Sequence, residues 1–560
     1  MGDRNLLLAF ALSFLVLSLW TSYVDPPRPP VQEPAPATSQ SAVVPGAAGA
    51  PIASPEVAPF GANASGAAPR MATGTPEPVD RSIYEGDEER YRVDRDGYVA
   101  TFSNVGGAIV EWRLVDYDEG SHYDETPIDL TFGAGASVTT PLLELGLGDL
   151  SRAVFRREPS DPGVVRFRVE HEGVSVVKQY TLSDDPYAFR LRIEITNQGS
   201  RSLRPAITAQ WRVTQRDSPD YRETMLTALQ SEGVENYPLS SIGKGGMFSS
   251  AEPVVELQRG IDWAGIGLTY FLAVLAPDQP GEATARFIAI EPGKTGLAEV
   301  GFPPVEIPPN QTFAREFRGY AGPKEERYLA AFGAETVRSV DLGWSWLAPL
   351  TSFFSWLLGA LYTIVPNYGV AIILVTVLVR VATMPLTNKQ MRSMERMRAM
   401  APKQKEIQEK YADDRQKQSE ELMALYKKEG VNPLGGCFPM LLQLPVFIGL
   451  FYALRSSIHL RQAPFVGWID DLSAPETLFT VPGIEVPIRI LPIVMGLSMV
   501  IQQRMTPMPS ADPAQAKMMM TVMPIMMTVL FYQFPSGLVL YWMVSNILAI
   551  LHQRWIGRRV

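Results

Sequence analysis

The feature that most constrains this chain is an apolar run that contains one cation. The stretch GVAIILVTVLVRVATMPL (Gly369–Leu386) is long and apolar enough to form a membrane-spanning helix, yet Arg380 lies within it. A guanidinium group stays charged, and placing it at bilayer depth costs about 3 kcal/mol or more. A cation in this position therefore indicates a function that requires it.

The N-terminal part contains a second apolar run, followed by a tract that cannot fold alone. Leu6–Val24 is long enough to cross a bilayer and lacks a small-x-small cleavage site, so 1–24 predicts an uncleaved membrane anchor and not a signal peptide. Residues 25–80 are rich in Pro, Ala and Gly. Such a tract buries too little apolar surface to form a core, and we expect it to be a disordered tether.

Between 81 and 340 the sequence changes to short runs that alternate apolar and polar residues. YVATFSNVGGAIVEWRLVDY (Tyr98–Tyr117) has the pattern of strand, glycine turn and strand, and Val164–Leu182 repeats it. Phe189–Val213 contains two more alternating runs, separated by Asn-Gln-Gly-Ser. These repeats predict a large antiparallel β-sandwich. His122 and His171 could belong to a sugar-binding site in such a domain, although surface histidines are the simpler interpretation.

The last third of the chain is predominantly apolar. Trp344–Val365 begins with Trp residues and ends before Pro366-Asn367, so we expect 341–366 to hold an interfacial amphipathic helix, with a full span as the alternative. The remaining segment, 367–560, is expected to be an α-helical core with five transmembrane spans. These lie at about 368–385, 434–454, 488–503, 518–534 and 537–553.

The distribution of Lys and Arg sets the orientation of the predicted spans. The segment 387–430 contains eleven of them and is therefore expected in the cytoplasm. Alternation of the spans then places both termini in the cytoplasm and residues 25–343 on the outer side of the membrane. Arg504, Lys517 and Arg554, at the ends of later spans, agree with this topology.

The segment 387–430 itself is predicted to be a hairpin of two charged helices, with breaks at Pro402 and at YADDRQ. Its first part combines methionines, which adapt to varied apolar partners, with basic residues. A merely solvated loop is the alternative. The candidate residues for capturing a partner are Met391, Met394, Arg396, Met397 and Arg398.

Arg380 could reach the membrane interface, pair with a buried acid, or line a wet cavity. The predicted spans from Tyr368 onward contain no Asp or Glu, so no intramembrane carboxylate is available for pairing. Thr376 lies one helical turn before Arg380 on the same face. Other polar residues interrupt the later spans, and together they favour a hydrated groove that opens to the cytoplasm: Gln443, Gln502, Gln533, Ser545 and Asn546.

Several classes of site are excluded by composition. Cys437 is the one cysteine, so the chain has no intramolecular disulfide and no cysteine-rich metal site. The four histidines are scattered without the spacing of metal ligands, and neither a phosphate-binding glycine loop nor a nucleophile elbow is present. We therefore expect no metal and no cofactor.

Three stretches carry a resemblance to a known family. They are LYKKEGVNPLGGCFPMLLQLPVFIGLFYALRSSIHLRQAPFVGWIDDLS (Leu425–Ser473), FPSGLVLYWMVSN (Phe534–Asn546) and the span around Arg380. They closely resemble the bacterial YidC membrane protein insertases, from Trp344 to the C-terminus. The anchor, tether and β-domain resemble the Gram-negative form of that family, whose periplasmic domain is a β-supersandwich.

The resemblance implies an inner-membrane insertase and chaperone that inserts newly made membrane proteins, alone or with the Sec translocon, and that is not an enzyme. On this reading the periplasm holds residues 25–343. It implies a hydrophilic groove around Arg380 and a path for the client helix past Thr376, Tyr541 and Trp542. The segment 387–430 matches the hairpin that captures clients. Nascent membrane proteins, the lipid bilayer and the Sec translocon are the implied partners, and no nucleic acid is bound directly. The chain ends at RRV without a long basic tail, so ribosome binding is expected to be weak or transient.

Two other functions remain open at this point. A solute transporter or channel would predict inverted repeats or paired broken spans, and we see no internal repeat. A membrane-anchored periplasmic carbohydrate-binding or epimerase-like protein would need a convergent acid/base pair in the β-domain.

Overall fold

The computed structural model describes residues 81–557, except 121–125, 133–137, 143–144, 146, 184, 217–218, 222, 231–232, 245–251, 412–413, 430–437, 484–485 and 506–517. These residues belong to one compact unit, Pro78–Val560. The predicted anchor, 1–24, and the predicted tether, 25–80, lie outside the described residues.

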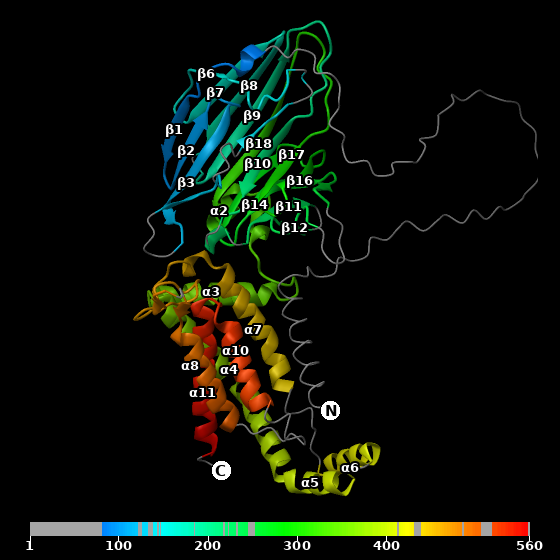
Figure 1. Cartoon of the computed structure of the whole chain (residues 1–560), viewed down its shortest axis with the longest axis vertical. Coiled ribbons are helices and arrows are strands. Elements are labelled where there is room, and N and C mark those ends of the chain that lie inside the picture. The colour runs from blue at the N-terminus through cyan, green and yellow to red at the C-terminus, as the bar shows by residue number, and fades with distance from the viewer. Residues whose placement is uncertain are drawn as a thin grey trace, which may run out of the picture. The chain divides into compact units, whose positions relative to one another are not determined.

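The residues up to Pro323 form two antiparallel sheets of nine strands each (Figure 1). The first sheet has the order β1-β2-β3-β5-β10-β17-β16-β13, with β4 paired to β3, and the second has the order β12-β11-β14-β15-β18-β9-β8-β7-β6. The strands of the first sheet are β1 Arg90–Arg95, β2 Tyr98–Ser103, β3 Ala108–Asp118, β4 Pro127–Asp129, β5 Val138–Thr139, β10 Thr208–Thr214, β13 Val254–Leu257, β16 Thr284–Glu291 and β17 Thr295–Gly301. Those of the second are β6 Arg156–Glu158, β7 Val164–His171, β8 Val174–Leu182, β9 Ala188–Asn197, β11 Met225–Gln230, β12 Gly233–Pro238, β14 Ile261–Gly267, β15 Phe271–Pro277 and β18 Gln311–Pro323.

The alternating runs predicted both hairpins correctly. Strands β2 and β3 pair across the turn at Gly106-Gly107, where both glycines have a positive φ that other residues rarely adopt. Strands β7 and β8 pair in the same way. The two runs in Phe189–Val213 are also strands, but β9 and β10 belong to different sheets. Alternation identifies a strand without identifying its partner, because pairing is decided by the packing of the whole sandwich.

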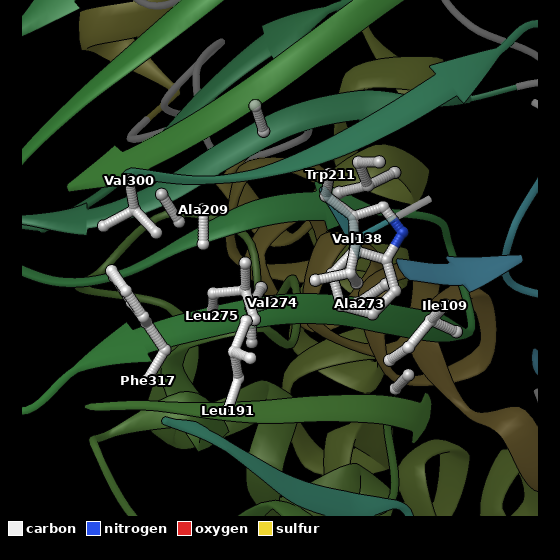
Figure 2. Close-up of a cluster of buried hydrophobic side chains, with 14 of the residues drawn as sticks. Ile109, Val138, Leu191, Ala209, Trp211, Ala273, Val274, Leu275, Val300 and Phe317 are labelled. Carbon is white, nitrogen blue, oxygen red and sulfur yellow. The ribbon is translucent and has the colours of Figure 1, made fainter. Parts of the chain in front are cut away.

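The core of the β-domain lies between the two sheets. Figure 2 shows Ile109, Val138 and Trp211 of the first sheet gathered with Leu191 and Phe317 of the second. All are almost completely buried, and burial of each large apolar side chain stabilises the fold by about 2 kcal/mol. The indole nitrogen of Trp211 donates to the carbonyl oxygen of Leu130, so this polar atom is satisfied inside the core.

One cation is buried in the same domain. The ammonium group of Lys178, on β8, donates to the carbonyl oxygens of Gly106 at 2.6 Å and Thr140 at 3.2 Å. The ring of Phe155 lies 4.7 Å from the nitrogen. Burial lowers the pKa of Lys178 to about 7. Lys178 thus joins β8 to the turn of the β2–β3 hairpin on the other sheet.

The rest of the described chain is mainly helical. The helices are α2 Glu326–Phe332, α3 Ala348–Ile364, α4 Tyr368–Ala399, α5 Ala401–Lys410, α6 Arg415–Lys428, α7 Phe438–Ser456, α8 Ile490–Met505, α10 Met523–Phe531 and α11 Ser536–Gly557. Short 3-10 helices occur at η1 Arg81–Tyr84, η3 Pro219–Tyr221, η4 Thr336–Ser339 and η6 Ile458–Leu460, and a π-helical turn, η7 Met518–Val522, precedes α10. Strands β19 Phe479–Val481 and β20 Val486–Ile488 form a small hairpin between α7 and α8.

Two of these helices are longer than the spans predicted from sequence. Helix α4 continues through Pro385 to Ala399, so Pro385 does not end it. A proline removes one backbone hydrogen bond, and the many other bonds of a 32-residue helix are sufficient to continue it. Helix α11 has 22 residues, whereas the predicted span had about 17. Among the described residues, Tyr368–Asn388 and Ser536–Trp555 are long and apolar enough to cross a membrane, and α3 and α8 are shorter apolar helices.

Helix α3 presents apolar residues on both of its sides. Phe354 and Leu358 are buried against α7 and α4, whereas Trp356 is 65% exposed. Figure 1 shows α3 running across the direction of α4, α7, α8 and α11. The interfacial position of this helix remains a prediction. Exposed aromatic residues such as Trp356 are typical of helices that lie at a membrane interface.

The segment after α4 contains both breaks predicted from sequence. Helix α4 ends at Ala399, just before Pro402, and α5 and α6 are separated at YADDRQ. Lys403 and Glu429 form an ion pair at 2.7 Å that joins the start of α5 to the end of α6. The first part of the predicted hairpin is not a separate helix, because α4 extends through it.

Candidate functional site

Arg380 bonds to a hydroxyl group on another helix. Its Nε and Nη2 atoms donate to Ser545 Oγ on α11 at 2.9 and 2.5 Å. Twelve residues separate Arg380 from the start of α4, which puts it about 18 Å along the helix. The side chain remains partly exposed and points toward α11, not along α4 toward the end of the helix.

The charge on Arg380 is not neutralised within the described part of the chain. There it has neither a salt bridge nor a second hydrogen-bond acceptor in addition to Ser545. A guanidinium carries five N–H donors, and the hydroxyl accepts only two of them. The remaining donors are available to water or to another molecule.

A second polar contact joins α11 to α8 beside the first. Asn546 Nδ2 donates to Ser498 Oγ at 3.1 Å, and both residues are buried. Together with the Arg380–Ser545 contact it forms a polar layer across α4, α11 and α8, which we call the arginine layer. Gln502, predicted to line the groove, lies one turn beyond Ser498 on α8 and is half-buried.

Tyr541 and Trp542 lie on α11, one turn before the arginine layer. The Tyr541 side chain forms hydrogen bonds with Gln443 of α7 and with Ser545, and it is 2% exposed. Trp542 is less buried, and its ring centroid lies 4.7 Å from that of Phe447. The structure therefore brings Gln443 and Tyr541 together with Arg380 through Ser545.

The side chain of Thr376 is less exposed than the sequence suggested. It is completely buried, and its hydroxyl donates to the carbonyl oxygen of Ile372 on its own helix at 2.7 Å. Gln533 lies in the exposed turn after α10 and not within a helix. These two residues make no described contact with Arg380. Ser545 was among the polar residues that the sequence indicated for the groove, although not as the partner of Arg380. The sequence analysis missed Ser498, which accepts from Asn546, because isolated serines in apolar helices usually serve helix packing.

The residues predicted to capture a partner lie on the extension of α4. Arg396 is exposed and Met391 is half-buried, and the helix is continuous from Arg380 to both of them. The backbone of Met394, Met397 and Arg398 belongs to the same helix. The candidate capture segment and the arginine layer therefore lie on one helix.

One end of the helices is tied together by the loop between α7 and α8. Asn367, just before α4, donates to the carbonyl oxygen of Phe465 at 3.2 Å. Ser536, the first residue of α11, donates to the carbonyl oxygen of Asp471 at 2.7 Å. Burial raises the pKa of Asp471, whose carboxylate accepts two hydrogen bonds from Ser473.

The same loop holds the start of α8. Glu476 is almost completely buried and accepts hydrogen bonds from the backbone N–H of Leu491 and from the indole of Trp468, both at 2.7 Å. Because the loop binds the first residues of α4, α8 and α11, these three helices run in one direction from a closed end.

The predicted histidine site in the β-domain has little support. His122 lies outside the described residues, and His171 ends β7 with its Nε2 atom 3.8 Å from Glu172.

Two family models together match most of the chain. The model described as "60Kd inner membrane protein" matches residues 360–560, and that of the YidC periplasmic domain matches residues 90–357. The chain is 33% identical over 572 residues to a membrane protein insertase YidC of Syntrophus aciditrophicus, covering 100% of both chains. It is 31% identical over 576 residues to a YidC of Methylobacillus flagellatus, covering 100% of this chain and 97% of the relative. A crystal structure of an active YidC insertase is 17% identical, covers 84% of this chain and 95% of that chain, and has a TM-score of 0.34.

These matches define the class as an inner-membrane protein with a periplasmic β-domain. The chain belongs to the YidC family of membrane protein insertases. Its function is the insertion of newly made membrane proteins, and its substrates are such chains together with the membrane that receives them.

Proposed function

We propose that this insertase receives the hydrophilic segment of a client at the arginine layer, between α4 and α11. The observation that carries the proposal is the charge of Arg380, which lies in an apolar helix and is bound only to Ser545 among the described residues. A structural cation in this position would be expected to have a carboxylate partner or several carbonyl partners.

The physical role of such a layer is to lower the barrier to crossing. Each peptide group that enters hydrocarbon without a partner is unfavourable by several kcal/mol. The free donors of Arg380, and water held by them, offer partners to the carbonyl groups of the entering segment. The membrane potential adds about 2.3 kcal/mol per charge per 100 mV, which favours export of acidic segments.

The apolar part of the client would follow a different route. Trp542 packs edge-to-face with Phe447 and at a tilted angle to Phe531 beside the arginine layer, and it supplies an aromatic surface for the apolar helix of the client. In this proposal Thr376, Gln443, Gln502, Tyr541 and Asn546 shape the groove, and the client helix leaves sideways into lipid.

The proposed topology has an N-terminal anchor and a core of five spans, with both termini in the cytoplasm and residues 25–343 in the periplasm. The positive segment 387–430 supports this orientation. It would capture clients with Met391, Met394, Arg396, Met397 and Arg398. The Sec translocon is the proposed partner for larger clients, and the ribosome would bind weakly or transiently.

The experiment that tests the groove is site-specific crosslinking of a stalled nascent chain. A photoreactive residue is placed in turn at positions 376, 443 and 542, with exposed position 294 in the β-domain as the control. We expect the hydrophilic segment of the client to crosslink at 443 and its apolar helix at 542. Equal crosslinking at all positions, or none at 443 and 542, would contradict the proposal.

A further inference from the structure

Two buried polar atoms lie beyond the arginine layer on the same pair of helices. Within the part of the chain that the structure describes, Asn388 Oδ1 on α4 and His552 Nε2 on α11 are buried without a hydrogen-bond partner. An unpaired buried acceptor is unfavourable in any fold, and native proteins retain few of them. Two of them together on neighbouring apolar helices call for a functional explanation.

The contact between Arg380 and Ser545 fixes how far these two atoms lie along the helices. Asn388 follows Arg380 by eight residues, which is about 12 Å along α4. His552 follows Ser545 by seven residues, which is about 10 Å along α11 and returns to the same face. Because both helices run in the same direction from the closed end, Asn388 and His552 lie at one level.

This level lies on the side of the arginine layer away from the closed end. The loop between α7 and α8 binds the first residues of α4 and α11, and both Asn388 and His552 are near the ends of the apolar segments Tyr368–Asn388 and Ser536–Trp555. His552 is near enough to Arg380 for the two side chains to interact electrostatically. With its proton on Nδ1, His552 offers Nε2 as an acceptor, as Asn388 offers Oδ1. Helices α4 and α11 then have donors at one level and, within the described chain, unpaired acceptors at the next.

From this arrangement we infer that Asn388 and His552 form an acceptor subsite for the backbone N–H groups of the client's hydrophilic segment. The inference rests on the proposed function, because it extends the same groove. An extended chain rises about 3.3 Å per residue, so three or four residues would reach from this subsite to Arg380. Of the two backbone polar groups, Arg380 can bind only the carbonyl oxygen, and the acceptor subsite binds the N–H group that Arg380 cannot.

Backbone groups are the ligand that best fits these two atoms. Every residue except proline carries one N–H donor, whatever the client's sequence. A phosphate group offers acceptors only, and it would repel an amide oxygen and an unprotonated ring nitrogen. A lipid ammonium is a donor, and it is the competing ligand that the experiment must separate.

The experiment uses the full chain in vesicles and two clients that differ in one property. Both clients have one apolar helix and a short hydrophilic tail, and in the second client prolines remove most of the N–H groups of the tail. The variants are Asn388→Leu and His552→Leu, singly and combined, with Asn388→Gln and His552→Gln as conservative controls that keep an acceptor. Vesicles with and without phosphatidylethanolamine test the lipid ammonium.

We expect the combined leucine variant to insert the first client about fivefold more slowly, and the second client at an unchanged rate. The glutamine variants should retain most of the activity. The leucine variants should unfold at the same temperature as the wild type or higher, because each replaces an unpaired buried acceptor by an apolar group. A merely structural role for these residues would instead lower the unfolding temperature.

Three results would overturn the inference. They are equal loss of rate for both clients, no loss for either, and a loss that appears only when phosphatidylethanolamine is present. Arg380→Ala, measured in the same assay, separates this inference from the proposed function. If Arg380→Ala stops insertion while the leucine variants do not, the acceptor subsite fails and the arginine layer stands.

Discussion

The β-domain and the helical core each bury a cation, and they satisfy it in different ways. Lys178 is fully enclosed, and its ammonium donates to two backbone carbonyl oxygens, of Gly106 and Thr140. Arg380 is partly exposed, and one hydroxyl accepts two of its five donors. The first arrangement fixes a turn to a strand, whereas the second leaves hydrogen-bonding capacity for a visiting molecule.

This difference distinguishes a structural cation from a functional one. Both cations belong to elements that are otherwise largely apolar. The discriminating property is the number of donors that the protein leaves unused. It follows that loss of Lys178 should affect stability first, and loss of Arg380 should affect insertion first.

The largest expected effect is the loss of insertion activity caused by the substitution Arg380→Ala. We expect at least a tenfold fall in the insertion rate of a single-span client in vesicles, because the donors for the entering segment are lost. The unfolding temperature should stay close to that of the wild type. Arg380→Lys should restore part of the rate if charge matters more than the fork of the guanidinium. Full activity of the alanine variant would remove Arg380 from the mechanism.

The next largest effect is the loss of stability caused by the substitution Lys178→Ala. We expect the free energy of unfolding to fall by about 3 kcal/mol, because two buried carbonyl oxygens lose their donor and a cavity opens. Urea unfolding of the full chain in detergent measures it, with Lys294→Ala, an exposed lysine, as the control. Insertion per folded molecule should not change. A stable Lys178→Ala protein that no longer inserts clients would reverse the comparison.

Lys178 should make the free energy of unfolding depend on pH. Its pKa is about 7 in the folded protein and about 10.4 in an unfolded chain. Between these values the unfolded state binds more protons, so this residue makes the free energy of unfolding rise with pH, by at most about 1.4 kcal/mol per pH unit.

The measurement is urea unfolding at pH 7, 8, 9 and 10 for the wild type and for Lys178→Met. The difference between the two proteins should grow in favour of the wild type as pH rises through this window. The same slope for both proteins would show that Lys178 does not titrate there.

The smallest expected effect is the slower insertion caused by the substitution Ser545→Ala. The hydroxyl accepts both hydrogen bonds that orient Arg380 toward α11, and its loss should slow insertion about threefold, or about 0.7 kcal/mol. Ser545→Thr keeps a hydroxyl and serves as the matched control. A tenfold or larger loss would mean that Ser545 itself contacts the client.

The sequence alone identified the parts of the fold that have a local signature. Alternating residues predicted the β2–β3 and β7–β8 hairpins, and Pro402 with YADDRQ predicted the breaks around α5. The helix that contains the predicted span at about 368–385 continues through Pro385 to Ala399, because backbone bonds on both sides keep α4 continuous. Local patterns therefore predicted which elements form better than where each one ends.

Within the site, the sequence by itself determined that Arg380 lies in an apolar run with no acid in any neighbouring span. Only the tertiary structure decided that Ser545, 165 residues away, accepts its hydrogen bonds, and that Asn388 Oδ1 and His552 Nε2 are buried without a partner among the described residues. The physical reason is that charge and hydropathy belong to each residue, whereas a partner depends on the rotation and the relative depth of packed helices. Those quantities are set by contacts along whole helices, which no short stretch of sequence contains.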